Sequence, residues 1–199
     1  MAMSSRLSSV KVADESEKRA VVDTLVQAFG SDPLTRWLFP TAHEHIRWFP
    51  ELVDRYAGSA FETETAHRLR DFEGSALWLP PGVHPDEEGL ADLSRTVLSE
   101  EEHAELGEAF DRVERSYPDE PSWYLAFIGV DPGHQGNGYG STLIEHALAQ
   151  CDRKNELATL ASSSPRNLSL YLRHGFELLD PVQVGSVPPI FPMVRYPNP

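Results

Sequence analysis

The sequence predicts a single α+β domain in which helices flank a sheet of short strands. Residues 67–79, interrupted at Glu73-Gly74, have the pattern of a two-stranded hairpin. Residues 123–130 are an apolar run that ends in a glycine-rich loop, and longer segments elsewhere have apolar residues at helical spacing. The chain has 199 residues, which suits one domain with one hydrophobic core. We therefore expect residues 1–199 to form one unit.

The elements are expected in a definite order. They are a disordered start at 1–9, a strand at 10–13, helices at 17–29 and 41–61, the hairpin at 67–79, helices at 86–97 and 99–116, the central strand at 123–130, a strand at 157–164 and a helix at 166–174. Ser99 and Glu102 form a capping box at the start of one helix. The two acidic helices form an insert, residues 84–117, before the central strand. After Phe176, two short proline-marked strands close the chain.

Composition excludes several classes of function. The net charge of −14 argues against nucleic acid, whose phosphates require a basic surface. The chain has no apolar run near twenty residues and no signal-peptide core in residues 1–10, so we expect a soluble, cytoplasmic protein without membrane contact. Cys151 is the only cysteine, and its place on an apolar helix face predicts a small buried side chain rather than a nucleophile.

Residues 128–141 read Ile-Gly-Val-Asp-Pro-Gly-His-Gln-Gly-Asn-Gly-Tyr-Gly-Ser. A strand, a glycine loop and a helix N-terminus in this order predict an anion site, because the first N–H groups of a helix have no partner of their own. A P-loop has Lys and then Ser or Thr after its last glycine, whereas Tyr139 and Gly140 follow Gly138 here. A dinucleotide fingerprint would need a third glycine where the chain has Ser141. Neither nucleotide motif is present.

The remaining pattern is Gln-x-x-Gly-x-Gly over residues 135–140, preceded by Val-x-Pro. It resembles the acyl-CoA loop of the GNAT superfamily of N-acetyltransferases. Residues 164–176 are similar to the second signature of that superfamily, Asn-x-x-x-Tyr-x-x-x-Gly-Phe, with Asn167 and Tyr171 on one helix face. Residues 118–177 resemble the puromycin N-acetyltransferase branch more closely.

The resemblance implies the GNAT acyltransferase fold, with a mixed, mostly antiparallel sheet of about six to seven strands. It also implies acetyl-CoA as cofactor, its pyrophosphate held by loop amides and its pantetheine arm by the central strand and Asn167. The cofactor residues are then Ile128, Gly129, Val130, Gln135, Gly136, Asn137, Gly138, Tyr139, Gly140, Ser141 and Asn167. An oxyanion donor is expected among the backbone N–H groups of residues 128–130, where the strand of this family carries a bulge. Tyr171 is the candidate general acid for the departing thiolate.

The acceptor side is implied to lie under the first two helices. Its candidate residues are Phe29, Asp32, Trp37, Glu120 and Tyr124. An aromatic wall with one carboxylate suits an amine carrying a ring, but the same aromatic residues are equally explained as packing between helices. The central strand holds no acidic residue, so the general base stays unassigned, with Glu120, Glu73 and His84 as alternatives.

Charged and metal-binding residues give weaker signals. Arg166, Arg173 and Lys154 are candidates for offsetting the charge of the cofactor in an acidic protein. His43 and His45 have no third ligand at useful spacing, so no metal site is expected.

The leading hypothesis is an acetyl-CoA-dependent N-acetyltransferase that acts on a primary amine of a small molecule by direct attack in a ternary complex. The alternatives are a transferase acting on a protein N-terminus or lysine, and a non-catalytic acyl-CoA-binding module. Either a monomer or a homodimer is compatible with the sequence.

Overall fold

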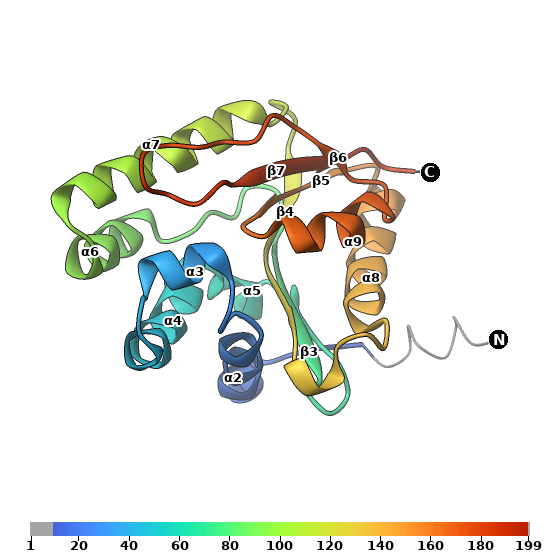
Figure 1. Ribbon diagram of the computed structural model, residues 1–199. Helices are drawn as coiled ribbons and strands as arrows, with labels where there is room; N and C mark the ends of the chain where they lie inside the picture. Colours follow the sequence, from blue (N-terminus) through green and yellow to red (C-terminus); the bar gives the residue numbers. More distant parts are fainter. Residues whose placement is uncertain (1–9, 199) are drawn as a thin grey trace.

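Seven strands form one sheet in the order β1-β2-β3-β4-β5-β7-β6 in the computed structural model, which describes residues 10–198 (Figure 1). All neighbouring strands are antiparallel except β4 and β5, which are parallel. The strands are β1 (Lys11–Val12), β2 (Ala66–Arg68), β3 (Gly74–Leu79), β4 (Ser122–Val130), β5 (Leu157–Ser162), β6 (Glu177–Leu178) and β7 (Phe191–Arg195). The predicted α+β class and the mixed, mostly antiparallel sheet are therefore confirmed. The expected disorder of residues 1–9 lies outside the described part of the chain.

Helices cover both faces of this sheet (Figure 1). One face carries the 3₁₀ helix η1 (Glu15–Glu17), α2 (Lys18–Ala28), α3 (Pro33–Leu38), α4 (Ala42–Ala57) and α5 (Ser59–Glu62). The other face carries α8 (Tyr139–Lys154) and α9 (Leu168–Leu172). Each face has its own apolar cluster, one around Phe49 and Leu77 and the other around Trp78 and Ile144. Cys151 is fully buried in the second cluster, as expected.

Helix α3 was not expected from the sequence. Six residues are too few to show helical periodicity, and only the start of the helix carries a signal. The side chain of Asp32 accepts a hydrogen bond from the backbone N–H of Thr35, and Pro33 occupies the first turn. The capping role of Asp32, which was predicted only as an acceptor-side residue, was therefore not expected from the sequence.

Helix α2 lies unusually close to the end of β4. A Cβ atom on Gly129 would stand 2.6 Å from the Cβ of Ala28 and 3.1 Å from the side chain of Leu25. A side chain at this position would therefore push α2 away from the sheet. Glycine here brings the C-terminal end of α2 against β4, and with it the connection that leads to α3.

Strand β4 separates from β5 halfway along its length. The two strands pair only from Ser122 to Leu125. At that point β4 also carries a bulge, because Leu77 pairs with Phe127 but Trp78 pairs with Leu125, which leaves Ala126 as the extra residue. The bulge was expected within residues 128–130 and lies earlier. Beyond Leu125, the β5-facing edge of β4 has no strand partner within residues 10–198.

Two acidic helices precede β4. Helices α6 (Glu87–Val97) and α7 (Glu100–Ser116) match the predicted segments, and the Ser99–Glu102 capping box is present. Helix α7 packs through Ala109 and Val113 on a third apolar cluster, which includes residues of the β6–β7 connection such as Val187. Glu105 of α7 also accepts hydrogen bonds from the backbone and hydroxyl of Ser186 in that connection.

The predicted helix at 166–174 is divided in two. A 3₁₀ turn η3 (Pro165–Asn167) precedes α9, and Gly175, with φ of +84°, ends the segment. Ser164 stands at the N-cap position of this turn, but its side chain makes no capping hydrogen bond. Strand β5 ends at Ser162, two residues before the predicted end of this strand. The hydroxyl of Ser162 donates to the carbonyl of Ser164 and accepts from its N–H. Among the described helices, none has both the length and the apolar character needed to cross a bilayer.

Candidate active site

A cavity of about 790 Å³ lies at the end of β4, between the α2–α3 connection and helices α8 and α9. The sequence-predicted residues that line it are Ile128, Gly129, Val130, Gln135, Gly136, Gly138, Tyr139, Gly140, Ser141, Asn167 and Tyr171, with Phe29 and Asp32 from the acceptor set. Residues that were not singled out complete the lining, among them Ala28, His134, Ser164 and Leu170. The cavity is thus built from segments that are far apart in the sequence.

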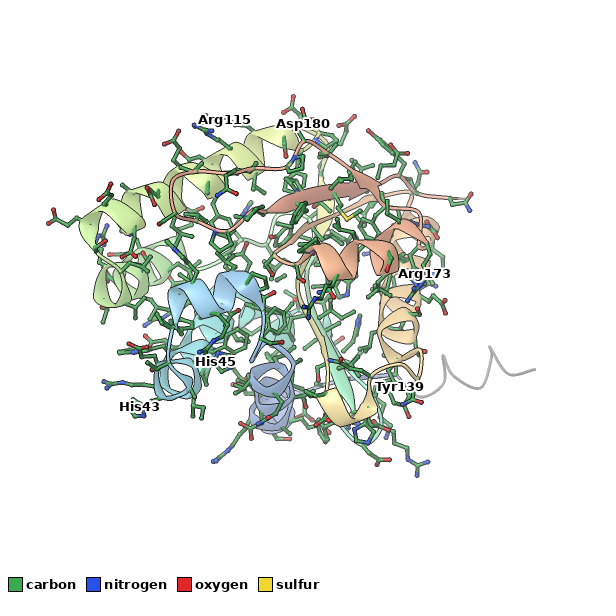
Figure 2. The ribbon with its side chains drawn as sticks, in the orientation of Figure 1. His43, His45, Arg115, Tyr139, Arg173 and Asp180 are labelled. Atoms are coloured by element: carbon green, nitrogen blue, oxygen red, sulfur yellow. The ribbon has the colours of Figure 1, made fainter. Side chains whose placement is uncertain are left out.

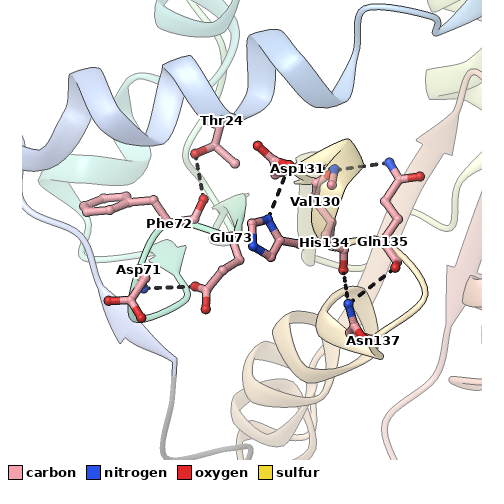
Figure 3. A network of polar contacts seen from close by, with 10 residues as sticks. Thr24, Asp71, Phe72, Glu73, Val130, Asp131, His134, Gln135 and Asn137 are labelled. Carbon is pink, nitrogen blue, oxygen red and sulfur yellow. Dashed lines mark hydrogen bonds and ion pairs between the residues drawn. The ribbon is translucent and has the colours of Figure 1, made fainter.

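The loop between β4 and α8 is shaped by two glycines and a set of side-chain hydrogen bonds. Gly136 and Gly138 have φ of +79° and +82°, the left-handed region that glycine adopts without strain. The Asn137 side chain donates to the carbonyls of His134 and Gln135 and supports the loop from within (Figure 3). Asn137 itself does not line the cavity.

The first part of the loop is tied to the end of β4 and to the residue that follows it. The side chain of Gln135 donates to the carbonyl of Val130 over 3.2 Å (Figure 3). The side chain of Asp131 accepts from the N–H of Gly133. The β2–β3 turn also holds the start of the loop, because the N–H of Asp131 donates to the carbonyl of Glu73. The loop is therefore held in place by contacts within the described residues.

These contacts leave a row of backbone donors unused. Within residues 10–198, no acceptor bonds the N–H groups of residues 135–141, and the first bond of α8 runs from Thr142 to Gly138. The positive end of the helix dipole lies at the same place. Arg166 and Arg173 line the cavity as well, and Arg173 lies 3.4 Å from the hydroxyl of Ser141. Unpaired N–H groups, a helix N-terminus and two guanidinium groups together suit a phosphate-bearing ligand.

Tyr171 lies on α9 with 5 % of its surface exposed, its ring 6.1 Å from that of Phe176. Its hydroxyl has no hydrogen-bond partner in the described chain, yet it is not enclosed, and the residue lines the cavity. Burial, assisted by the nearby charge of Asp32, raises the pKa of this phenol. Tyr171 therefore holds its proton at neutral pH and presents it to the cavity.

Asp32 stands on the opposite wall and is fixed through both oxygens. One oxygen accepts from the Thr35 backbone at 3.0 Å, and the other accepts from the hydroxyl of Ser163 at 2.5 Å. Ser163 was not predicted as a site residue, since its only signal in the sequence was a run of serines at the end of a predicted strand. Among the described residues that line the cavity, Asp32 is the one with an acidic side chain.

Three predicted acceptor residues lie outside this cavity. Glu120 is exposed beyond the opposite end of β4. The hydroxyl of Tyr124 bonds that of Tyr56 at 3.0 Å, and Trp37 packs between two apolar clusters. Among the other candidates, Glu73 accepts from a backbone N–H in the β2–β3 turn, and Lys154 lies over the ring of Trp123.

His43 and His45, the two histidines considered for metal binding, differ in their exposure to solvent. His43 is exposed, whereas the buried His45 donates through Nε2 to the carbonyl of Val26 at 2.8 Å. They lie on the α3–α4 side of the molecule, while Tyr139 and Arg173 lie on the α8–α9 side (Figure 2). Residues 10–198 contain no group of three His, Cys, Asp or Glu side chains that could hold a metal ion.

Comparison with known proteins defines the class of this protein. Residues 93–178 match the acetyltransferase (GNAT) domain, a span that contains β4, the glycine loop, α8, β5 and α9. The chain therefore carries a GNAT acetyltransferase domain within a GNAT fold, and it is an N-acetyltransferase enzyme.

Individual relatives agree with this class. The chain is 27 % identical over 184 residues to an uncharacterised N-acetyltransferase of Schizosaccharomyces pombe, covering 84 % of this chain and 74 % of the relative. The structure resembles a protein from Corynebacterium glutamicum described as histone acetyltransferase HPA2 and related acetyltransferase, with a TM-score of 0.68, 24 % identity and coverage of 96 % and 97 % of the two chains. It also resembles the polyamine N-acetyltransferase of Drosophila melanogaster, which forms N-acetylagmatine, with a TM-score of 0.60, 17 % identity and coverage of 94 % and 98 %.

Proposed function

We propose that this protein transfers the acetyl group of acetyl-CoA to a primary amine of a small molecule by direct attack in a ternary complex. One observation carries the proposal: a single cavity is lined by Tyr171, by Asp32 and by the loop residues 135–136 and 138–141, whose N–H groups are unpaired within residues 10–198. These are the groups required to hold a phosphorylated acyl carrier, to protonate a departing thiolate and to bind an amine.

The residues present fit coenzyme A. The N–H groups of the loop and the N-terminus of α8 would hold its diphosphate, with Arg166 and Arg173 offsetting further phosphate charge. The unpaired edge of β4 beyond Leu125 offers backbone groups to an amide-containing arm, and Asn167 lies beside the same cavity. When bound, the thioester supplies the activated acetyl group. A backbone N–H on this part of β4 would stabilise the developing oxyanion by roughly 3–4 kcal/mol.

In the proposed reaction, Asp32 is the proton acceptor and Tyr171 is the proton donor. An alkyl amine with a pKa of about 10 is neutral in about one molecule per thousand at pH 7, a free-energy cost of about 4 kcal/mol. Asp32 accepts an N–H of the incoming amine and receives the proton that the nitrogen loses as the C–N bond forms. With acetyl-CoA bound, Tyr171 would give its proton to the sulfur as the C–S bond breaks, so that coenzyme A leaves as the free thiol. Exchange with solvent would then return a proton to Tyr171 and remove the one held by Asp32.

Two considerations favour a small molecule as acceptor. The carboxylate lies inside a cavity rather than on an open face. The Drosophila enzyme of the same fold acts on a small amine, to judge from the product for which it is described. The closer resemblance to the puromycin branch covers residues 118–177, which contribute mainly to the cofactor side, so it does not specify the acceptor.

The test is release of free thiol from acetyl-CoA with a panel of small amines, an N-terminal peptide and a lysine peptide. We expect thiol release with at least one small amine and none above background with the peptides. Turnover of peptides alone would make the protein a peptide acetyltransferase. Binding of coenzyme A without turnover of any acceptor would leave a non-catalytic acyl-CoA-binding module.

A further inference from the structure

The glycine loop depends on few contacts for its position in the molecule. Its residues 132–138 are exposed, so they have little packing to hold them. The side-chain bonds of the loop stay within it and its junction with β4, and they set its shape. Among the described residues, one hydrogen bond joins this loop to a segment other than β4 and α8. It runs from the N–H of Asp131 to the carbonyl of Glu73 over 2.9 Å, so the position of the loop depends on the β2–β3 turn.

The β2–β3 turn contains a residue with an unusual backbone conformation. Phe72, which precedes Glu73, has φ of +59°, and a bulky L-residue adopts this value only where its surroundings hold it there. The guanidinium carbon of Arg68 lies 4.7 Å from the centre of the Phe72 ring, and the ring packs against the apolar cluster around Phe49. These contacts hold the ring and leave the peptide group between Phe72 and Glu73 to be held from elsewhere.

Thr24 of α2 holds this peptide group (Figure 3). Its hydroxyl lies 3.0 Å from the carbonyl oxygen of Phe72 and 3.0 Å from that of Ala20, so its one hydrogen is shared between them. A threonine inside a helix often bonds the carbonyl four residues earlier, as Thr24 does with Ala20, whereas the bond to Phe72 reaches a different segment. Within residues 10–198, no other donor bonds the Phe72 carbonyl, and Thr24 is buried.

Helix α2 gives this contact a firm support. Ala28 lies one turn after Thr24 on the same face of the helix. It meets the end of β4 at Gly129, where an added Cβ atom would stand 2.6 Å from the Cβ of Ala28, and it also lines the cavity. The helix therefore contacts β4 directly through Ala28 and reaches the start of the loop through Thr24 and the β2–β3 turn.

We infer that Thr24 is a positioning residue for acetyl-CoA: its hydroxyl holds the β2–β3 turn, and the turn holds the loop whose N–H groups would bind the diphosphate. Thr24 does not line the cavity, so it acts through Glu73 and Asp131 rather than by touching the cofactor. Without the hydroxyl, the Phe72 carbonyl loses its donor, and the turn and the loop can shift together. This inference rests on the proposed function, because it takes the loop as the cofactor site.

The experiment compares three variants with the wild type. Thr24→Val keeps the branched shape and removes the hydroxyl, whereas Thr24→Ser keeps the hydroxyl. Thr96→Val is the matched control, because Thr96 of α6 also bonds the carbonyl four residues earlier but lies away from the cavity. In Thr24→Val, the Kd for coenzyme A by calorimetry and the KM for acetyl-CoA rise about fivefold, while kcat stays within twofold. Thr24→Ser and Thr96→Val stay within twofold of the wild type in all three quantities.

Amide hydrogen exchange reports the contact directly in the protein without ligand. The N–H of Asp131 exchanges at least tenfold faster in Thr24→Val than in the wild type, and at the wild-type rate in the other two variants. Unchanged exchange and affinity in Thr24→Val, equal effects of Val and Ser at this position, or a fall in kcat with unchanged KM overturns the inference and leaves the acetyltransferase function intact. Absence of coenzyme A binding by the wild type overturns both.

Discussion

The hydroxyl of Ser163 donates a hydrogen bond to Asp32 over 2.5 Å, although the two residues are 131 positions apart. The contact joins the segment that follows β5 to the cap of α3, and the cavity is lined by Asp32 and by Ser164, the residue after Ser163. Since the second carboxylate oxygen is bonded to the Thr35 backbone, the orientation of Asp32 is set by the fold rather than by a ligand. A preoriented carboxylate opposite Tyr171 is the central arrangement of the proposed site.

Replacing Asp32 by Asn tests the charge of this group. Asn retains the size of the side chain; its oxygen can still cap α3, and its NH2 group can donate to the hydroxyl oxygen of Ser163, so the fold should be kept. We expect kcat/KM for the amine to fall at least tenfold, with the KM for acetyl-CoA changed less than twofold, in steady-state thiol-release assays. Asp180→Asn, an exposed acid near the edge of the molecule, serves as control (Figure 2). Equal activity of Asp32→Asn and the control would remove Asp32 from the reaction.

Tyr171→Phe removes the proton presented to the sulfur and keeps the buried ring. We expect turnover to fall at least tenfold while the affinity for coenzyme A, measured by calorimetry, stays within twofold. Because burial raises the pKa of this phenol, it remains protonated from pH 6 to 9, and the ratio of wild-type to variant rates should be constant over that range. Undiminished turnover in the variant would exclude Tyr171 as the acid.

Gly136→Ala tests the shape of the glycine loop. An added Cβ would meet no atom within 4 Å, so the substitution acts through the backbone, where φ of +79° costs an L-residue about 1–2 kcal/mol. The loop should relax and lose the alignment of its N–H groups, raising the KM for acetyl-CoA several-fold. Gly107→Ala is the matched control, since it also meets no atom but lies within α7, where alanine is favoured. An unchanged KM in Gly136→Ala would mean that the left-handed geometry is not needed for binding.

The residues on the cofactor side of the cavity could be predicted from the sequence more fully than those on the acceptor side. Gly136, Gly138 and Tyr171 lie in short continuous patterns whose spacing directly encodes a loop and a helix face. By contrast, the contact between Ser163 and Asp32 depends on how distant segments pack, and no local pattern encodes it. The same reason explains why α3 was missed and why the Ala126 bulge, which depends on pairing with β3, was misplaced.

The ring of His67 on β2 packs against that of His146 on α8, and this buried histidine makes the stability of the fold depend on pH. His67 is fully buried, its ring 4.7 Å from that of His146, and neither of its ring nitrogens has a partner within residues 10–198. Burial, with a smaller contribution from His146, lowers the pKa of His67 to about 3, against about 6.5 in the unfolded chain. The unfolded state therefore binds the extra proton between these values, and stability falls as the pH drops below 6.5.

The loss attributable to His67 between pH 7 and pH 5 is about 2 kcal/mol. His67→Leu, which removes the titrating group, should lose about that much less stability than the wild type over this interval, as measured by urea unfolding at both pH values. His43→Leu, at an exposed histidine, should follow the wild type. Since the acidic side chains are common to all three proteins, their contributions cancel in the comparison. An equal loss in wild type and His67→Leu would mean that this ring is hydrated or bonded in the folded protein and does not govern its acid sensitivity.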